Sequence, residues 1–281
     1  MTGEVEMRIL CDTHTHTLHS RHAYSTLEEN VRAAAQAGLE LLGSTDHFSS
    51  MLGPGVGFEG DPDLRDYQFF INQEVWPRVW HGVTVLRGAE ADIVDLDGHL
   101  FGHGFPQPRN ISLGRYKHAL DLDERVLGGV DYAIASVHGK GFAEGASVSE
   151  TTRMYVRALE NPKVLILGHI GRSGIDFDVD EVVSAARDLH KLIEINETSL
   201  AHRAERSARC PSIAQRCAEL GCQISVGSDA HISCDVGRFD AVSALLDEIG
   251  FPEELVASRS GEAFLAALDA AGLHVDLGGP L

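Results

Sequence analysis

Histidines and carboxylates follow the apolar, strand-like segments of this 281-residue chain, each near the carboxyl end of its segment. Imidazole and carboxylate groups are the side chains that bind zinc, manganese and iron in proteins. A parallel α/β barrel places all its strand ends around one rim, where the active sites of such barrels lie. The sequence therefore predicts a pocket for several metal ions at that rim. The segments and the polar residues that follow them are 7–12 with His14 and His16, 39–45 with Asp46 and His47, 83–88 with Glu90, 132–137 with His138, 164–168 with His169, and 223–227 with Asp229 and His231.

The densest of these motifs is Asp12-Thr13-His14-Thr15-His16. Alternate side chains of an extended segment point to the same side, so His14 and His16 can reach one ion. Asp12 lies on that side as well, and we expect it to orient one imidazole by accepting a hydrogen bond. Glu90 closes an otherwise apolar strand, where a buried charge without a partner would be costly and a metal ion is a common solution.

Each of these histidines taken alone has a simpler explanation, a core imidazole bonded to a backbone carbonyl. The repetition of the same ending on strand after strand favours the metal pocket instead. The other histidines are expected to have no metal role, and His99 and His103 lie near each other in a stretch without a matching carboxylate. These other histidines are His19, His81, His99, His103, His118, His190, His202 and His274.

Strands and helices alternate from end to end, which is the pattern of a parallel sheet. Ser25 to Glu28 has the form of a capping box that opens a helix through Gln36, and Gly38 is a natural stop after it. A glycine- and proline-rich loop over 53–63 precedes an expected helix over 64–80, and Asp97-Gly98 indicates an excursion from the barrel. Further helices are expected over 149–159, 180–189 and 211–220, with two more, 240–249 and 261–271, packed outside the barrel. Residues 255–258 are a doubtful eighth strand, so the pattern indicates an irregular barrel.

The composition limits the class of protein. The length suits one domain over residues 1–281. The formal charge of −19 argues against a nucleic-acid surface, since binding phosphate backbones needs clustered Lys and Arg. Three divalent cations would bring it to −13, although most of the excess is expected to be a solubilising surface. The five cysteines form no CxxC pair, and no apolar run reaches a membrane-spanning length, so we expect a cytoplasmic protein with reduced thiols.

Eight short motifs together resemble the PHP superfamily, named for polymerase and histidinol phosphatase, and its small bacterial phosphatase branch in particular. The likeness covers residues 8–264, almost the whole chain. In order, the motifs are DTHTH, HAYST at residues 22–26, STDH, RGAEAD, SVHGK, GHIG, EINET and GSDAH.

The resemblance implies a distorted seven-stranded, TIM-like α/β barrel with a centre of three divalent metal ions, whose identity as Zn, Mn or Fe stays open. It implies three ligand sets, one for each ion, and Glu90 would bridge the first and second ions. The sets are His14, His16 and Asp229; Glu90, His138 and His169; and His22, His47 and His231. The motif after the sixth strand also adds a carboxylate, Glu197, which we expect near the pocket.

Metal ions held close together can activate a water molecule, so we expect such a centre to hydrolyse a small phosphate monoester by direct attack of that water, with no covalent intermediate. The substrate's phosphate would also suit a guanidinium fork, and Arg172 and Arg203 are candidates by their position after strands. The alternative for both is a surface arginine. Asp229 or His231 would be placed to assist the leaving group, and no general acid is assigned.

Three other functions stay open on the sequence alone. One is a phosphodiesterase or nuclease acting on nucleotides, and a second is amide or lactone hydrolysis by the same kind of centre. The third is a non-catalytic metal-binding protein on the same scaffold, which the complete set of nine ligands disfavours. The sequence leaves the substrate, the native metal and the oligomeric state undetermined.

Overall fold

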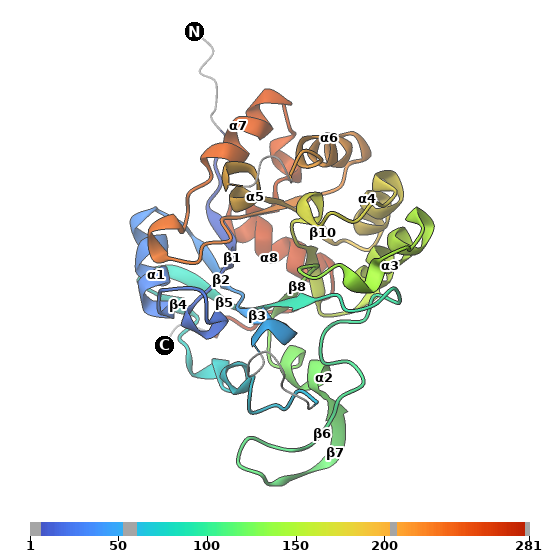
Figure 1. Cartoon of the computed structure of the whole chain (residues 1–281). Coiled ribbons are helices and arrows are strands. Elements are labelled where there is room, and N and C mark those ends of the chain that lie inside the picture. Colours follow the sequence, from blue (N-terminus) through green and yellow to red (C-terminus); the bar gives the residue numbers. More distant parts are fainter. Residues whose placement is uncertain (1–6, 53–60, 203–206, 279–281) are drawn as a thin grey trace.

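Seven parallel strands form a nearly closed barrel in this computed structural model, which describes residues 7–52, 61–202 and 207–278. The order around the barrel is β1-β2-β5-β8-β9-β10-β11, and a parallel bridge from Thr15 to Ala230 joins the two end strands. The prediction of a seven-stranded, TIM-like barrel is confirmed (Figure 1). The strands of this path are β1 (Cys11–Thr15), β2 (Leu41–Ser44), β5 (Val83–Asp92), β8 (Tyr132–Ser136), β9 (Val164–Leu167), β10 (Leu192–Asn196) and β11 (Ile224–Gly227).

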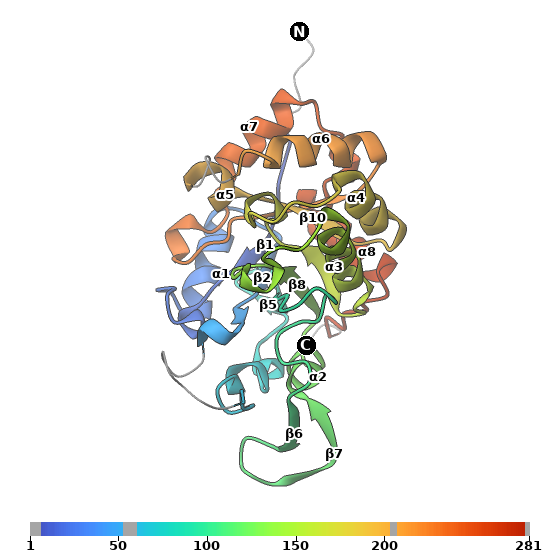
Figure 2. The same cartoon turned by 45° about the vertical axis from the view of Figure 1, so that its right-hand side comes forward.

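Amphipathic helices surround this barrel, and the caps expected from the sequence start several of them. The capping box of α1 joins Thr26 to Glu29, one residue later than predicted, and Pro211 opens α6. Helices α3, α4 and α6 lie next to one another on one flank of the barrel (Figures 1 and 2). The helices of the described ranges are α1 (Leu27–Gln36), α2 (Leu122–Leu127), α3 (Val148–Glu160), α4 (Val179–Asp188), α5 (Glu197–His202), α6 (Cys210–Leu220), α7 (Asp240–Glu248) and α8 (Gly261–Ala270).

Two apolar clusters hold the fold together. The larger one lies between the strands and the surrounding helices, and the smaller one includes inward residues of the strands and one face of α8. In the smaller cluster, Tyr132 meets Phe264 of α8 edge to face, with ring centroids 5.6 Å apart. The Tyr132 hydroxyl crosses to β1 and donates to Thr13 O at 2.7 Å, which it can do because Gly43 has no side chain in its path.

The helix predicted over 64–80 is wrong. The structure has two short 3-10 turns there, Gln68–Phe70 and Gln73–Val75, followed by the two-residue strand β4 (Val79–Trp80), antiparallel to β5. Pro77 disfavours a helical conformation at the residue before it, and Trp76 is extended. Tyr67 and Phe70 pack edge to face on Phe48 instead of lining one face of a helix. Residues 53–60 of the preceding loop lie outside the described residues.

The predicted excursion after β5 is a separate β-hairpin. Strands β6 (Pro106–Arg109) and β7 (Arg115–Asp121) pair antiparallel, and α2 follows them. Both views show this hairpin projecting away from the barrel (Figures 1 and 2). The short strand β3 (His47–Phe48) adds to β5 on the barrel side, parallel to it.

The doubtful eighth strand over 255–258 is reduced to one parallel bridge between Val256 and Ile224. The chain turns into a 3-10 turn at Ala257–Arg259 directly afterwards, so no strand forms. Helix α7 packs beside α5, and α8 carries the apolar face described above. Every helix of the described ranges falls short of the length and apolar character that crossing a bilayer requires. The cytoplasmic location and the single domain over 1–281 stay predictions.

Candidate metal centre

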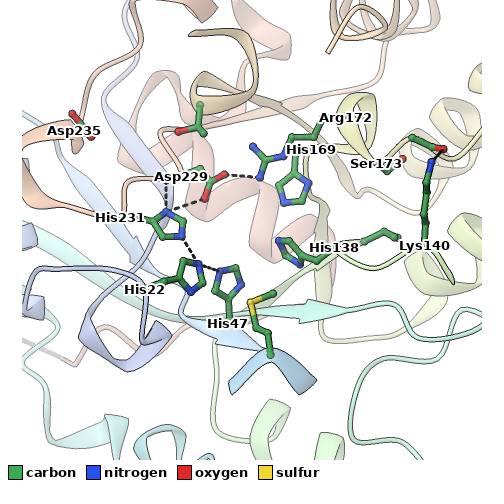
Figure 3. A pocket seen from close by; sticks show the side chains of 14 residues that line it. His22, His47, His138, Lys140, His169, Arg172, Ser173, Asp229, His231 and Asp235 are labelled. Atoms are coloured by element: carbon green, nitrogen blue, oxygen red, sulfur yellow. Dashed lines mark hydrogen bonds and ion pairs between the residues drawn. The ribbon is translucent and has the colours of Figure 1, made fainter. Parts of the chain in front are cut away.

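A polar pocket of about 850 Å³ opens where the strands β3, β8, β9 and β11 end. Its wall includes six of the nine predicted ligands, which come from loops far apart in the sequence and point toward one another in Figure 3. The remaining three, His14, His16 and Glu90, are fully buried. The six ligands in the wall are His22, His47, His138, His169, Asp229 and His231.

Glu90 is the centre of the cluster. It lies on β5, where it is paired with His47 of β3 in the parallel register. Nitrogens of five imidazoles surround its carboxylate. The distances to Oε2 are 2.8 Å from His47 Nδ1, 3.3 Å from His14 Nε2 and 3.5 Å from His16 Nε2. Those to Oε1 are 2.7 Å from His169 Nε2 and 3.4 Å from His138 Nε2.

The other two predicted sets are also brought together. Asp229 Oδ1 lies 3.2 Å from His16 Nε2 and 3.7 Å from His14 Nε2. His22 Nε2 lies 3.3 Å from His47 Nε2 and 3.0 Å from the Nε2 atom of His231.

Three trios of these residues have ligand atoms near enough to share one ion each. One trio is identical to a predicted set, and the other two overlap with the predicted sets in part. The trios are His14, His16 and Asp229; His47, Glu90 and His138; and His16, His47 and His231. All nine residues thus lie in one cluster, while their division among ions stays a prediction.

Unpaired buried atoms show that this donor set fits cations. Glu90 Oε2, His47 Nδ1 and His169 Nδ1 are buried and have no hydrogen-bond partner among the residues that the structure describes. His47 Nδ1 stands only 2.8 Å from Glu90 Oε2, so this contact has the distance of a hydrogen bond but not its geometry. Leaving such groups unpaired in the interior is costly, and a bound cation would satisfy them.

Four imidazoles are oriented by acceptors on the side away from the cluster. Carboxylates hold two of them: Glu194 Oε1 lies 2.7 Å from His14 Nδ1, and Asp92 Oδ1 lies 2.6 Å from His138 Nδ1. The other two are His16, whose Nδ1 is 3.1 Å from Ser20 Oγ, and His231, whose Nδ1 is 2.9 Å from Asp229 O. Fixing one ring nitrogen in this way leaves the Nε2 lone pair to face the centre, as in known carboxylate–histidine–metal arrangements.

Two predicted ligands have left-handed backbones, which are uncommon outside glycine. His169 has φ 32° and Asp229 has φ 57°. Each is held by a hydrogen bond from its backbone N–H, to Glu194 Oε2 at 2.7 Å and to His14 O at 2.8 Å. Strained residues of this kind gather at functional sites, where the surrounding structure maintains them.

Charge pairing, opposed by burial, sets the ionisation of the cluster. Burial raises the pKa of Glu90, but His138 and His14 outweigh it and hold that pKa well below its usual range. The pKa of Asp229 is likewise low despite burial, chiefly because of His14. Burial disfavours protonation of His14, yet Glu194 and Glu90 raise its pKa well above the usual value. Both carboxylates are therefore ionised and suited to cations.

Arg172 lies in the pocket wall, and its guanidinium is already engaged by protein groups, so its predicted contact with substrate stays a prediction. Nη2 donates to Asp229 Oδ2 at 2.7 Å, and Nη1 donates to Asn196 Oδ1 at 3.1 Å and to Ser199 Oγ at 2.9 Å. This network holds Asp229, a predicted metal ligand, in place, whatever contact Arg172 makes with substrate. Arg203 lies outside the described residues, so its role stays a prediction.

Two expected carboxylate positions are wrong. Asp12 orients no imidazole, because its oxygens accept from the backbone N–H groups of His14, Ser228 and Gly237. Glu197 does not face the pocket, since both its oxygens accept backbone N–H groups at the start of α7.

Sequence reasoning missed Glu194 and Asp92, the two carboxylates that orient His14 and His138. Their signal was a charged residue within an otherwise apolar strand, in EINET and RGAEAD. The same signal did lead to Glu90.

A barrel with histidines and carboxylates gathered at its carboxyl rim defines a class of α/β-barrel enzymes. Within that class, the PHP domain family model matches residues 12–200, and the chain belongs to this family, as predicted. Probable phosphatases of Caldanaerobacter subterraneus and Photobacterium profundum are 38% and 37% identical to the chain. The matches cover 92% of this chain and 91% of the first relative, and 95% and 96% for the second. The prediction of a phosphatase-class enzyme is confirmed.

Solved structures show the same fold at low sequence identity. A histidinol phosphate phosphatase from Lactococcus lactis, crystallised with zinc, L-histidinol and phosphate, matches with a TM-score of 0.52 and 18% identity. The match covers 88% of this chain and 95% of that one. A putative histidinol phosphatase from Listeria monocytogenes has the same TM-score at 16% identity, over 81% and 97% of the two chains.

Proposed function

We propose that this protein is a metal-dependent phosphatase that hydrolyses small phosphate monoesters at a centre of three divalent ions. The observation that carries the proposal is that the nine side chains form one cluster, with five imidazoles around the buried Glu90 carboxylate and six of the nine residues in the wall of one pocket. The zinc and phosphate named with the Lactococcus lactis structure, and the names of the curated relatives, support the same chemistry.

When bound, divalent cations lower the pKa of a water molecule and neutralise charge that grows on the phosphate oxygens. The protein's own side chains would hold these cations in position. Glu90 supplies the central negative charge, while Glu194 and Asp92 hold the rings of His14 and His138 so that their Nε2 atoms face the pocket. Such preset positions avoid reorganisation during the reaction.

The pocket favours water over a side chain as the nucleophile. Two hydroxyl groups occur among its described lining residues, those of Ser173 and Thr198. Ser173 Oγ donates to Ile170 O at 3.0 Å, and Thr198 Oγ1 donates to Ser228 O at 2.9 Å. Both protons are thus engaged with backbone carbonyls. Within the described ranges no imidazole is hydrogen-bonded to either oxygen, as activation of a nucleophile in a covalent mechanism would need.

The proposal is tested by metal analysis together with turnover of p-nitrophenyl phosphate. Glu90→Ala and His47→Ala should each lower the bound metal and abolish turnover, because each removes a donor at the middle of the cluster. His274→Ala is the matched control, since this histidine is exposed and contacts only Asp269 in the described structure. Full metal occupancy with normal activity in both variants would refute the assignment.

A second assay separates the phosphatase from a phosphodiesterase. The wild-type enzyme should turn over p-nitrophenyl phosphate much faster than bis(p-nitrophenyl) phosphate, because a monoester dianion places more charge against the cations. A preference for the diester would instead favour action on nucleotides or other diesters. No activity on either ester in metal-loaded protein would favour a non-catalytic metal-binding role.

A further inference from the structure

A second group of metal-binding side chains lies at the base of the β6–β7 hairpin. It consists of His103, Asp121 and Asp123, whose ligand atoms lie within 4.8 Å of one another. None of the three lines the pocket of the candidate metal centre. Sequence analysis found no carboxylate partner for His103, because Asp121 and Asp123 come close to it only when the hairpin folds back.

Two glycine turns bring the group together. Gly102 and Gly104 have φ of 95° and 77°, so the chain bends tightly on both sides of His103. Gly104 N donates to Asp121 Oδ2 at 2.8 Å. A side chain at position 102 would collide with the backbone of Asp123, which shows how closely the turn approaches the start of α2.

The ring of His103 is held in place before any ligand arrives. It stacks on the His99 ring, with centroids 3.8 Å apart and planes at 8°. His99 is fixed in turn by Asp95, whose Oδ2 lies 2.8 Å from His99 Nδ1. His103 is therefore presented by a rigid support, which reduces the entropy lost on binding an ion.

Asp123 is a buried carboxylate, and one of its two oxygens accepts no hydrogen bond from the described residues. The residue is 8% exposed, and its Oδ1 accepts from Glu124 N at 2.9 Å. Oδ2 faces His103 Nδ1 at 3.9 Å, too far for a hydrogen bond. That separation suits two ligands of one ion, since each would lie about 2.0–2.2 Å from zinc.

We propose that His103, Asp121 and Asp123 bind one divalent transition-metal ion that ties the hairpin base to α2. One imidazole with two carboxylates is a donor set suited to zinc or manganese. The cavity beside His103 and Asp123, about 430 Å³ and open to solvent, leaves room for waters to complete the coordination. The ion would stabilise the base of the hairpin, and it would take no part in hydrolysis.

Anomalous diffraction from crystals of the full-length, zinc-loaded protein tests the proposal directly. We expect an anomalous peak between His103 and Asp123 in maps calculated from data on both sides of the zinc absorption edge. The peak should remain after dialysis of the protein against metal-free buffer. Absence of the peak would overturn the proposal. So would a peak that is lost on dialysis, since this would mean adventitious binding.

Variants make the test independent of the catalytic centre. His103→Ala and Asp123→Asn should each bind one zinc ion fewer per chain than wild type, with unchanged turnover of p-nitrophenyl phosphate. His118→Ala, on the same hairpin, is the matched control and should keep the full count. An unchanged zinc count in both variants would overturn the proposal. If a variant fails to fold, the wild-type anomalous map still decides, and it locates the two sites separately, so either proposal can fail alone.

Discussion

One carboxylate, Glu194, positions two predicted ligands that come from different strands. Oε1 meets His14 Nδ1 and Oε2 accepts the backbone N–H of His169, both at 2.7 Å. It therefore sets a ring orientation on β1 and a strained backbone after β9 at once. It also occupies the space next to Gly227, where a side chain would collide with Glu194 and His14.

Glu194→Gln tests this positioning role. The amide has the same shape but replaces one acceptor by a donor, so one of the two contacts is lost. We expect metal affinity to fall about 10- to 100-fold, the usual effect of removing such an orienting group. Competition with a chelator measures the affinity, and excess metal should restore part of the turnover. Glu248→Gln on the exposed end of α7 is the control, and equal affinity in the two variants would contradict the assigned role.

At the scale of elements, the sequence predicted most of the barrel because its strands are short apolar runs that end at polar residues. The nine candidate ligands follow from the same feature and from the family motifs. The failures have tertiary causes. Aromatic packing on Phe48 and the restriction before Pro77 override the apparent helix over 64–80. Most partners of Asp12, and both partners of Glu197, are backbone groups of distant segments, which no local pattern indicates.

Glu197 joins two helices, and this connection can be tested. Its oxygens accept from Ala241 N and Val242 N, both at 2.9 Å, at the start of α7, where the N-cap residue Phe239 offers no side-chain acceptor. Glu197→Ala should lower the free energy of unfolding by about 1–2 kcal/mol, the range for losing a helix cap and its charge. Glu197→Gln keeps one acceptor and should lose less. Urea unfolding of metal-loaded protein measures both, and unchanged midpoints would contradict the capping role.

At the scale of the whole molecule, protons and metal ions compete for the same cluster. The chain carries a formal charge of −19, and two of its buried carboxylates, Glu90 and Glu194, lie against imidazoles. Metal ligands must be deprotonated, so binding of cations releases the protons that these imidazoles hold. The stability that metals add to the fold must therefore depend on pH.

The direction of that dependence follows from His138. Burial disfavours its protonation, but Glu90 and Asp92 outweigh burial and raise its pKa from 6.5 to about 9 in the metal-free protein. Because the folded pKa lies above the unfolded one, protonated His138 stabilises the metal-free fold below pH 6.5. That contribution is lost as the pH rises through about 9. The same proton must leave His138 before the ring can bind a metal ion. The apparent metal affinity should therefore rise by up to about tenfold per pH unit between pH 6.5 and about 9.

Differential scanning calorimetry at fixed free metal concentration measures this effect as the difference in Tm between metal-loaded and chelated protein. We expect the difference to grow from pH 6.5 to about pH 9 and then to level off for this group. Asp92→Asn removes one of the charges that raise the pKa of His138, so the rise should end at a lower pH in that variant. A Tm difference that stays constant with pH in both proteins would mean that no proton leaves the cluster when metal binds, contrary to the coupling of Glu90 and His138.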